Sequence, residues 1–142
     1  MTTGFEVERQ SIEEEFNTGW VSSTCPIKFQ NLNGLVKGTS MINDVKGLTK
    51  WCRLEILPAA SNNAVVGGTT IRHFGNIVVN LFTKSGTGSD TIRELADDVY
   101  DIFKNKTFDG IHCEAPFFNI EGNNEEWFQA TVTIPYYRDQ GV

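Results

Sequence analysis

The sequence is poor in cysteine and has no long hydrophobic run. Its three cysteines, Cys25, Cys52 and Cys113, are odd in number and far apart, which excludes a disulfide framework or the close pairs of a zinc site. Each lies in a strand-like stretch, so we expect reduced thiols in the core. No segment approaches the roughly 20 apolar residues of a membrane span, and the first residues lack a signal-peptide run. We therefore expect a chain made and kept in a cytoplasm, with no membrane partner.

Basic residues are also scarce and scattered. The chain has 12 Lys and Arg against 18 Asp and Glu, a net charge of −6. Because affinity for nucleic acid rests mainly on cations that neutralise phosphates, this balance disfavours a tight DNA or RNA binder. The length of 142 residues and the apolar content of 39% suit one globular domain spanning residues 1–142.

A recognisable set of catalytic residues is missing as well. The two histidines, His73 and His112, lie in different predicted strands, without a nearby nucleophile or a second ligand at metal spacing. Asp97, Asp98 and Asp101 have the chemistry of an acid/base pair or a Mg²⁺ site, but they fall on the polar face of a predicted helix. These patterns favour structural roles, and a small metal- or nucleotide-dependent enzyme stays an alternative.

The stretch LFTKSGTGSD, residues 81–90, runs from a predicted strand through two glycines into a predicted helix, as a phosphate-binding loop does. A P-loop places its lysine after the second glycine, whereas Lys84 precedes both Gly86 and Gly88. Asp90 stands where it repels an anion. The stretch therefore indicates helix initiation, with Ser89, Asp90 or Thr91 as N-cap and a capping box formed by Thr91 and Glu94.

Hydrophobic periodicity predicts two helices and about five strands. Residues 5–19 carry apolar positions Phe5, Ile12 and Phe16, and residues 89–105 carry a stronger apolar stripe. Alternation predicts strands at 25–31, 51–57, 71–83, 111–122 and 126–139, the last two as a hairpin and 71–83 as the central strand. The connections 32–50 and 58–70 are expected to be mobile loops. The predicted fold is a single α+β domain with a mostly antiparallel sheet of about four to five strands and two helices.

Five large aromatic residues stand at element ends or on the polar side of a strand. Such residues are enriched in protein interfaces, which favours an assembly protein over an enzyme. The alternative is that they pack beneath the long connections. The five are Trp20, Trp51, Trp127, Tyr136 and Tyr137.

Three groups of residues follow one another along the second half of the chain. They are Ile77, Val79, Gly86 and Gly88 in and after one predicted strand, Leu95, Ala96, Asp97 and Phe103 in the predicted helix, and Trp127, Val132, Ile134, Pro135, Tyr136, Arg138 and Asp139 in the last predicted strand. Their order and spacing resemble the tail terminator-like proteins of long-tailed bacteriophages, which have a strand like "-I-V--P-G-G", a helix like "A--LAD-I---F" and a last strand like "W---V-IPYR-D". The chain departs from this pattern in its longer 32–50 connection and in lacking the proline before the glycines.

The resemblance implies a small α+β subunit that forms a homo-hexameric ring on the head-proximal end of the tail tube. The ring ends tube polymerisation and joins the tube protein to a neck or head completion protein. DNA passes through it without specific binding, and no catalysis, metal or cofactor is implied. A head–tail connector or neck completion protein is the alternative within the same class.

Exposure and loop position predict the residues that contact a neighbouring subunit or the tube. Arg53 and Glu55, on the outward side of one strand, are expected to pair between identical neighbours. The full predicted interface is Lys37, Met41, Asp44, Lys46, Trp51, Arg53, Glu55, Arg72, Tyr137 and Arg138.

Overall fold

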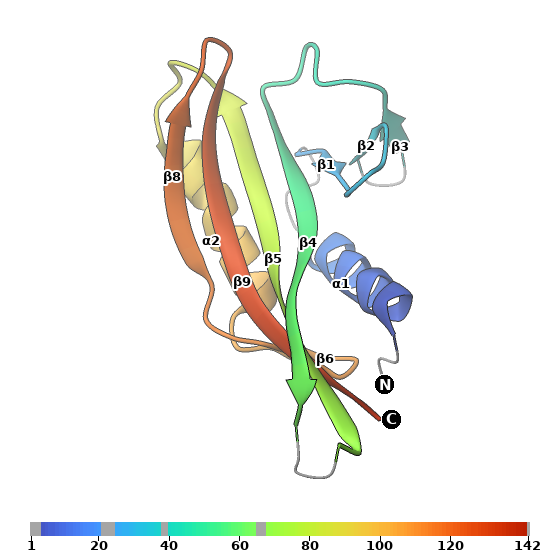
Figure 1. The fold of residues 1–142 in the computed structure, drawn as a ribbon. Coiled ribbons are helices and arrows are strands. Elements are labelled where there is room, and N and C mark those ends of the chain that lie inside the picture. The colour runs from blue at the N-terminus through green and yellow to red at the C-terminus, as the bar shows by residue number, and fades with distance from the viewer. Residues whose placement is uncertain (1–3, 21–24, 38–39, 65–67, 142) are drawn as a thin grey trace.

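The computed structural model describes residues 4–20, 25–37, 40–64 and 68–141 (Figure 1). Within these ranges it has two helices and nine strands, and neither helix is long and apolar enough to cross a bilayer. The elements are α1 (Phe5–Gly19), β1 (Ile27–Lys28), β2 (Leu35–Lys37), β3 (Ser40–Ile42), β4 (Lys50–Asn63), β5 (Thr70–Lys84), α2 (Asp90–Phe103), β6 (Thr107–Phe108), β7 (Ile111–Cys113), β8 (Phe117–Asn123) and β9 (Trp127–Gly141).

The strands form one sheet in the order β3-β2-β1-β4-β5-β9-β7-β6, with β8 also paired to β9. Only β1 and β4 are parallel, so the predicted α+β domain with two helices and a mostly antiparallel sheet is confirmed. The predicted count of four to five strands is wrong. Residues 32–50 add β2 and β3, a short β6 follows α2, and the predicted strand 111–122 breaks at 114–116 into β7 and β8.

The central strand β5 pairs with β4 on one side and with β9 along its whole length on the other, as expected from its apolar residues on both faces. On one face Ile77, Val79 and Leu81 are fully buried in the main core, together with Ile12 and Phe16 of α1. Burial of each such side chain stabilises the fold by about 1.5–3 kcal/mol. The predicted stripe of α2 lies in the same core and is confirmed: Ile92, Leu95, Ala96, Val99, Ile102 and Phe103.

The predicted loop at 58–70 is mostly strand. β4 continues to Asn63 and β5 begins at Thr70, with a register shift between Pro58 and Ser61. β9 runs beside β5 as far as the Thr70–Gly141 pair. Figure 1 shows these strands continuing past the helices as a projecting arm. The prediction was wrong because small and polar residues have weak strand propensity on their own, whereas pairing with neighbouring strands supplies the backbone hydrogen bonds.

Glu8 and Arg138 form a buried ion pair between α1 and β9. The Arg138 Nε donates to Glu8 Oε1 at 2.6 Å, and the two side chains are 0% and 4% exposed. A second bond runs from Arg138 Nη1 to Gln140 Oε1 at 2.9 Å. Phe5, 58% exposed rather than buried as predicted, has its ring centroid 5.1 Å from the guanidinium carbon. The pair ties the first helix to the last strand, 130 residues away in the chain.

Gly75 makes room for Tyr136 in the middle of the sheet. The two residues are cross-strand partners in β5 and β9. A Cβ on Gly75 meets the Tyr136 hydroxyl at 2.6 Å and its ring carbons at 2.7 and 2.8 Å. Tyr136 is 2% exposed, and burial, followed by the charge of Glu8, raises the pKa of its hydroxyl far above its ordinary value. Glycine is therefore needed here for close packing, although it weakens a strand.

Glu8→Ala is expected to destabilise the fold by about 3–5 kcal/mol, because it leaves the Arg138 charge buried without its partner. Urea unfolding followed by circular dichroism measures the change. Glu6→Ala is the matched control, since Glu6 is an exposed carboxylate two residues earlier in the same helix, and its unfolding midpoint stays near that of the wild type. Equal midpoints for the two variants contradict the role given to Glu8.

Gly75→Ala is expected to destabilise the fold by about 1–3 kcal/mol, because the new methyl group forces Tyr136 out of its packed position. Gly141→Ala, at the end of the same strand pairing, is the control, because nothing lies within 4 Å of a Cβ there. The same unfolding measurement compares them. A Gly75→Ala protein as stable as Gly141→Ala shows that Tyr136 is not held as described.

Candidate assembly surfaces

The glycine loop is a helix start and holds no recognisable phosphate cradle. Gly86 and Gly88 have φ of +85° and +89°, which favour glycine, and α2 begins directly after them at Asp90. The Lys84 ammonium is engaged elsewhere, 3.2 Å from Glu126 Oε1 and 4.7 Å from the Trp127 ring centroid. The N-cap of this helix is Ser89, which was one of the three residues predicted for that position.

The capping box predicted for this helix is wrong. The N-cap of α2 makes no side-chain hydrogen bond. The nearby Thr87 hydroxyl instead donates to the Lys84 carbonyl oxygen at 2.7 Å, inside the turn. The sequence pattern of a capping box does not require the N-cap side chain to adopt the capping geometry, and here the two glycines set the path into the helix.

The two histidines lie on opposite faces of the sheet. In β9, the cross-strand partner of His73 is Arg138 and that of His112 is Tyr137, and neighbouring strand residues point to opposite sides. His73 Nδ1 lies 2.6 Å from the Ser61 hydroxyl, a contact that the sequence did not predict, and its ring packs edge-on against Phe5. The histidines therefore form no joint site.

No group of three or more His, Cys, Asp or Glu within the described ranges is placed to hold a metal ion. The α2 carboxylates lie along the helix, where burial, followed by the charges of Asp101 and Asp97, raises the pKa of Asp98. All three cysteines are free and buried, as predicted. Burial raises the pKa of Cys113 to about 12, so its thiol stays protonated and unreactive at neutral pH.

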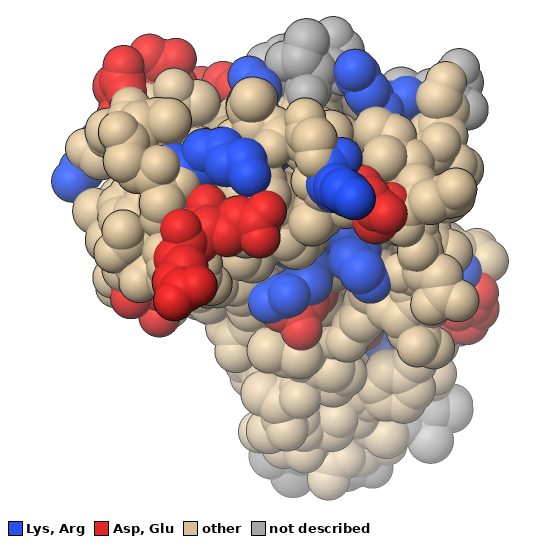
Figure 2. Space-filling view, turned by 90° about the horizontal axis from the view of Figure 1, so that it is seen from above, with Lys and Arg blue, Asp and Glu red and all other residues tan. Residues whose placement is uncertain are grey.

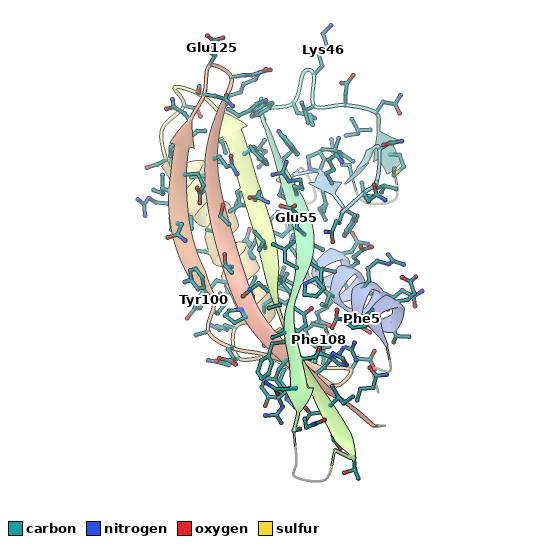
Figure 3. All side chains as sticks on the ribbon, viewed as in Figure 1. Phe5, Lys46, Glu55, Tyr100, Phe108 and Glu125 are labelled. Atoms are coloured by element: carbon teal, nitrogen blue, oxygen red, sulfur yellow. The ribbon has the colours of Figure 1, made fainter. Side chains whose placement is uncertain are left out.

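Four of the predicted interface residues lie on the 32–50 connection, and all four are exposed: Lys37, Met41, Asp44 and Lys46. Met41 is 57% exposed, on the outermost strand β3. Figure 3 shows Lys46 at the upper end of the molecule, the same end as Glu125. In the view onto that end, cations and carboxylates are interspersed without a basic stripe (Figure 2).

Trp51 is not available to a partner in the way predicted. It is 8% exposed and stacks on Phe82, with centroids 4.1 Å apart, and edge-on against Trp127 at 6.1 Å. Leu35 completes this second buried cluster, and Ile42, Val45 and Leu48 pack against it. The alternative to an interface role, packing beneath a long connection, is therefore confirmed for Trp51 and Trp127, which lie beneath the 32–50 connection. Tyr136 is likewise buried, while Trp20 and Tyr137 are half-buried.

Arg53 and Glu55 lie on the sheet face opposite the buried Ile77 and Leu81. The two side chains are 38% and 32% exposed, and their charged atoms are 3.6 Å apart. Glu55 Oε1 also accepts a hydrogen bond from the Asn80 amide at 2.8 Å. Arg53 and Glu55 are thus already paired with each other within the subunit. Their pairing between neighbouring subunits stays a prediction, and neither charge needs it to be neutralised.

The projecting arm carries the remaining predicted residues. Arg72 donates to both Asp139 carboxylate oxygens, at 2.7 and 3.0 Å, and its guanidinium carbon lies 4.4 Å from the Tyr137 ring centroid. Tyr137 stacks in turn on His112, with centroids 4.7 Å apart. Arg72 and Tyr137 remain partly exposed, whereas Arg138 is fully buried. Its predicted surface position is wrong, because alternation along β9 points it, like Tyr136, towards the helices.

The sequence did not predict three exposed apolar residues on α2 and β8: Tyr100, Phe117 and Ile120. Their exposed fractions are 42%, 51% and 44%. The signal for Phe117 was the Phe-Phe pair at 117–118, since adjacent residues of a strand point to opposite faces and one of the two is turned away from the core. Tyr100 lies on the α2 side of the molecule and Phe5 on the α1 side (Figure 3).

Arg72→Met is expected to raise the pKa of Asp139, because the hydrogen bond from Arg72 is the main cause that lowers this pKa, with its charge adding to the effect. The carboxylate thus favours the folded arm above its unfolded pKa, and the benefit is lost as pH falls through the lowered folded pKa. Carbon-detected NMR titration of the carboxyl group measures the shift. Arg53→Met is the control on another part of the sheet. An unchanged Asp139 pKa in Arg72→Met contradicts this assignment.

Comparisons with known proteins agree on the family and the fold. A family model described as "Phage tail terminator protein" matches residues 9–136. A search of curated proteins finds no match. One solved structure is 16% identical, aligns over 99% of both chains with a TM-score of 0.67, and so shares the fold. Because the family match spans most of the sequence, the chain belongs to the phage tail terminator family and is a structural component of the phage tail.

Proposed function

We propose that this protein caps the head-proximal end of the tail tube as a ring of six identical subunits. The ring stops the addition of further tube protein and presents the surface that joins the neck. The observation that carries the proposal is the family match over residues 9–136. The protein acts by occupying the growing end of the tail tube. This mechanism needs binding surfaces and no chemical reaction.

The shape and charge of the subunit support a ring. Identical subunits close into a ring through a heterologous contact, in which two different patches on opposite sides of each subunit meet. The sheet ends in two different edges, β3 on one side and β8 with β6 on the other, so the subunit has two distinct sides to offer. A net charge of −6 suits a channel through which DNA moves without adhering.

The proposed partners are the tail tube protein on one ring face and a neck or head completion protein on the other. Six of the predicted interface residues keep the exposure that such contacts need: Lys37, Met41, Asp44, Lys46, Arg72 and Tyr137. Arg53 and Glu55 stay candidate interface residues, although they are paired with each other inside the subunit. Trp51 and Arg138 are buried and are no longer proposed as interface residues.

The test is electron microscopy of tubes polymerised from the tube protein of the same virus, with this protein present from the start. We expect tubes with a ring of extra density at one end and a shorter length distribution than in its absence. Addition after polymerisation has finished is the control, because it places the ring without shortening the tubes. Tubes that grow bare and unchanged contradict the proposal; binding to DNA-filled heads then supports the neck-protein alternative.

The enzyme alternative has its own control in the same assay. The triple variant His73→Ala, His112→Ala and Asp98→Ala removes the residues on which the hypothesis of an enzyme rests. We expect this variant to cap tubes as the wild type does, provided that circular dichroism shows it to be folded. A folded variant that fails to cap tubes indicates that these residues act in the function and overturns the assignment of a purely structural role to them.

A further inference from the structure

An apolar cavity lies between α2 and β8. It has a volume of about 130 Å³, with Ala96 and Tyr100 on the helix side and Phe117 and Val132 on the sheet side. Arg93 and Asp97 also line it. With Tyr100 and Phe117 about half exposed, this surface leaves large apolar area in contact with solvent. Contiguous exposed apolar area of this kind marks an interaction site.

The strand beside this cavity has an open edge. Among the described strands, β8 pairs only with β9. Its seven residues, FFNIEGN, contain no lysine and no proline, two residues that commonly protect an edge strand from pairing with another chain. The protective features that it does have, Glu121 and a register shift between Ile120 and Gly122, lie in its second half. The unpaired backbone groups of β8 and the cavity together form one surface, which we call the β8 surface and define by Tyr100, Phe117, Asp97 and the β8 edge.

The opposite side of the sheet carries a complementary element. β3 ends the sheet and, in the described part of the chain, pairs only with β2. Met41, at the centre of β3, is an unbranched apolar side chain that is 57% exposed. Lys37 lies opposite Ser40 in the β2–β3 pair, so its side chain is on the other face of this ribbon from Met41. We call Met41 and the β3 edge the β3 surface.

The charges of the two sides are opposite. α2 carries five carboxylates and one arginine, a net charge of −4. Residues 27–50, which include β1 to β3, carry four lysines and one aspartate, a net charge of +3. Figure 1 shows β8 and β3 on opposite sides of the upper half of the molecule. A heterologous ring contact requires two different, complementary patches on each subunit, and these two sides differ in charge.

We propose that the occupant of the β8 surface is the β3 surface of a second copy of this chain. The β3 edge adds to the β8 edge, Met41 enters the cavity against Tyr100 and Phe117, and the positive charge of residues 27–50 lies towards the negative charge of α2. This rests on the proposed ring and identifies the contact between its neighbours. Strand addition supplies backbone hydrogen bonds, while the methionine and the charges fix register and direction.

Cysteine cross-linking tests the contact directly. In the variant Met41→Cys/Phe117→Cys, a short bismaleimide is expected to link subunits into a ladder that reaches six, whereas each single variant stays unlinked when treated alone. A mixture of the two single variants gives a linked dimer. The native cysteines are buried and unreactive, so they do not interfere. Linking within either single variant alone indicates a symmetric contact and overturns the proposal.

The outcomes separate this proposal from the proposed function. If the wild type caps tubes but no ladder forms, the ring stands and the β8–β3 contact is overturned. If the wild type forms no oligomer in solution and leaves tubes bare, the ring and the contact fall together. A ladder that reaches six, from a double variant that also caps tubes, supports both.

Discussion

The pairing of β5 with β4 on one side and β9 on the other is the constraint on which the rest of the structure depends. It presents Ile77, Val79 and Leu81 to the core beneath both helices. On the other face it places Phe82 against Trp51 in the second buried cluster. The same pairing continues beyond the helices. It holds the segments of the arm as strands, although their amino-acid composition does not favour strand structure. Because the long strands occupy the centre, the short or open strands β3 and β8 lie towards opposite sides of the sheet. The surfaces proposed for assembly are a consequence of this order.

Local patterns predicted the elements whose signal is contained in a single segment. The apolar stripe of α2, the two-sided apolar character of β5 and the hairpin of β8 and β9 were all foreseen from spacing alone. The failures concern partners distant in the chain. Nothing near Arg138 in the sequence indicates that Glu8, 130 residues away, makes its burial possible. Nor does the polar stretch after Pro58 reveal that pairing with β5 holds it as strand.

The candidate surfaces were predictable to a smaller extent. Loop position correctly indicated exposure for Met41 and Lys46, because charged or flexible residues in a connection seldom have a core to enter. It failed for Trp51, since the same connection folds over the aromatic cluster and covers it. The β8 surface was missed because it exists only when α2 packs beside β8, a juxtaposition of segments that have no periodic relation to each other. Family membership, by contrast, could be predicted from the order of several motifs. Each motif is weak on its own, because its residues also have a local structural role.

The most direct measurement is a high-resolution cryo-electron microscopy reconstruction of the head-proximal end of isolated tails. The account predicts six copies of this chain in one ring above the last tube layer, with β3 of each copy beside β8 of the next and Met41 buried between them. A tail end that lacks this chain contradicts the capping role. A ring in which Met41 and Phe117 of neighbouring copies both remain in solvent contradicts the contact, while the capping role stands.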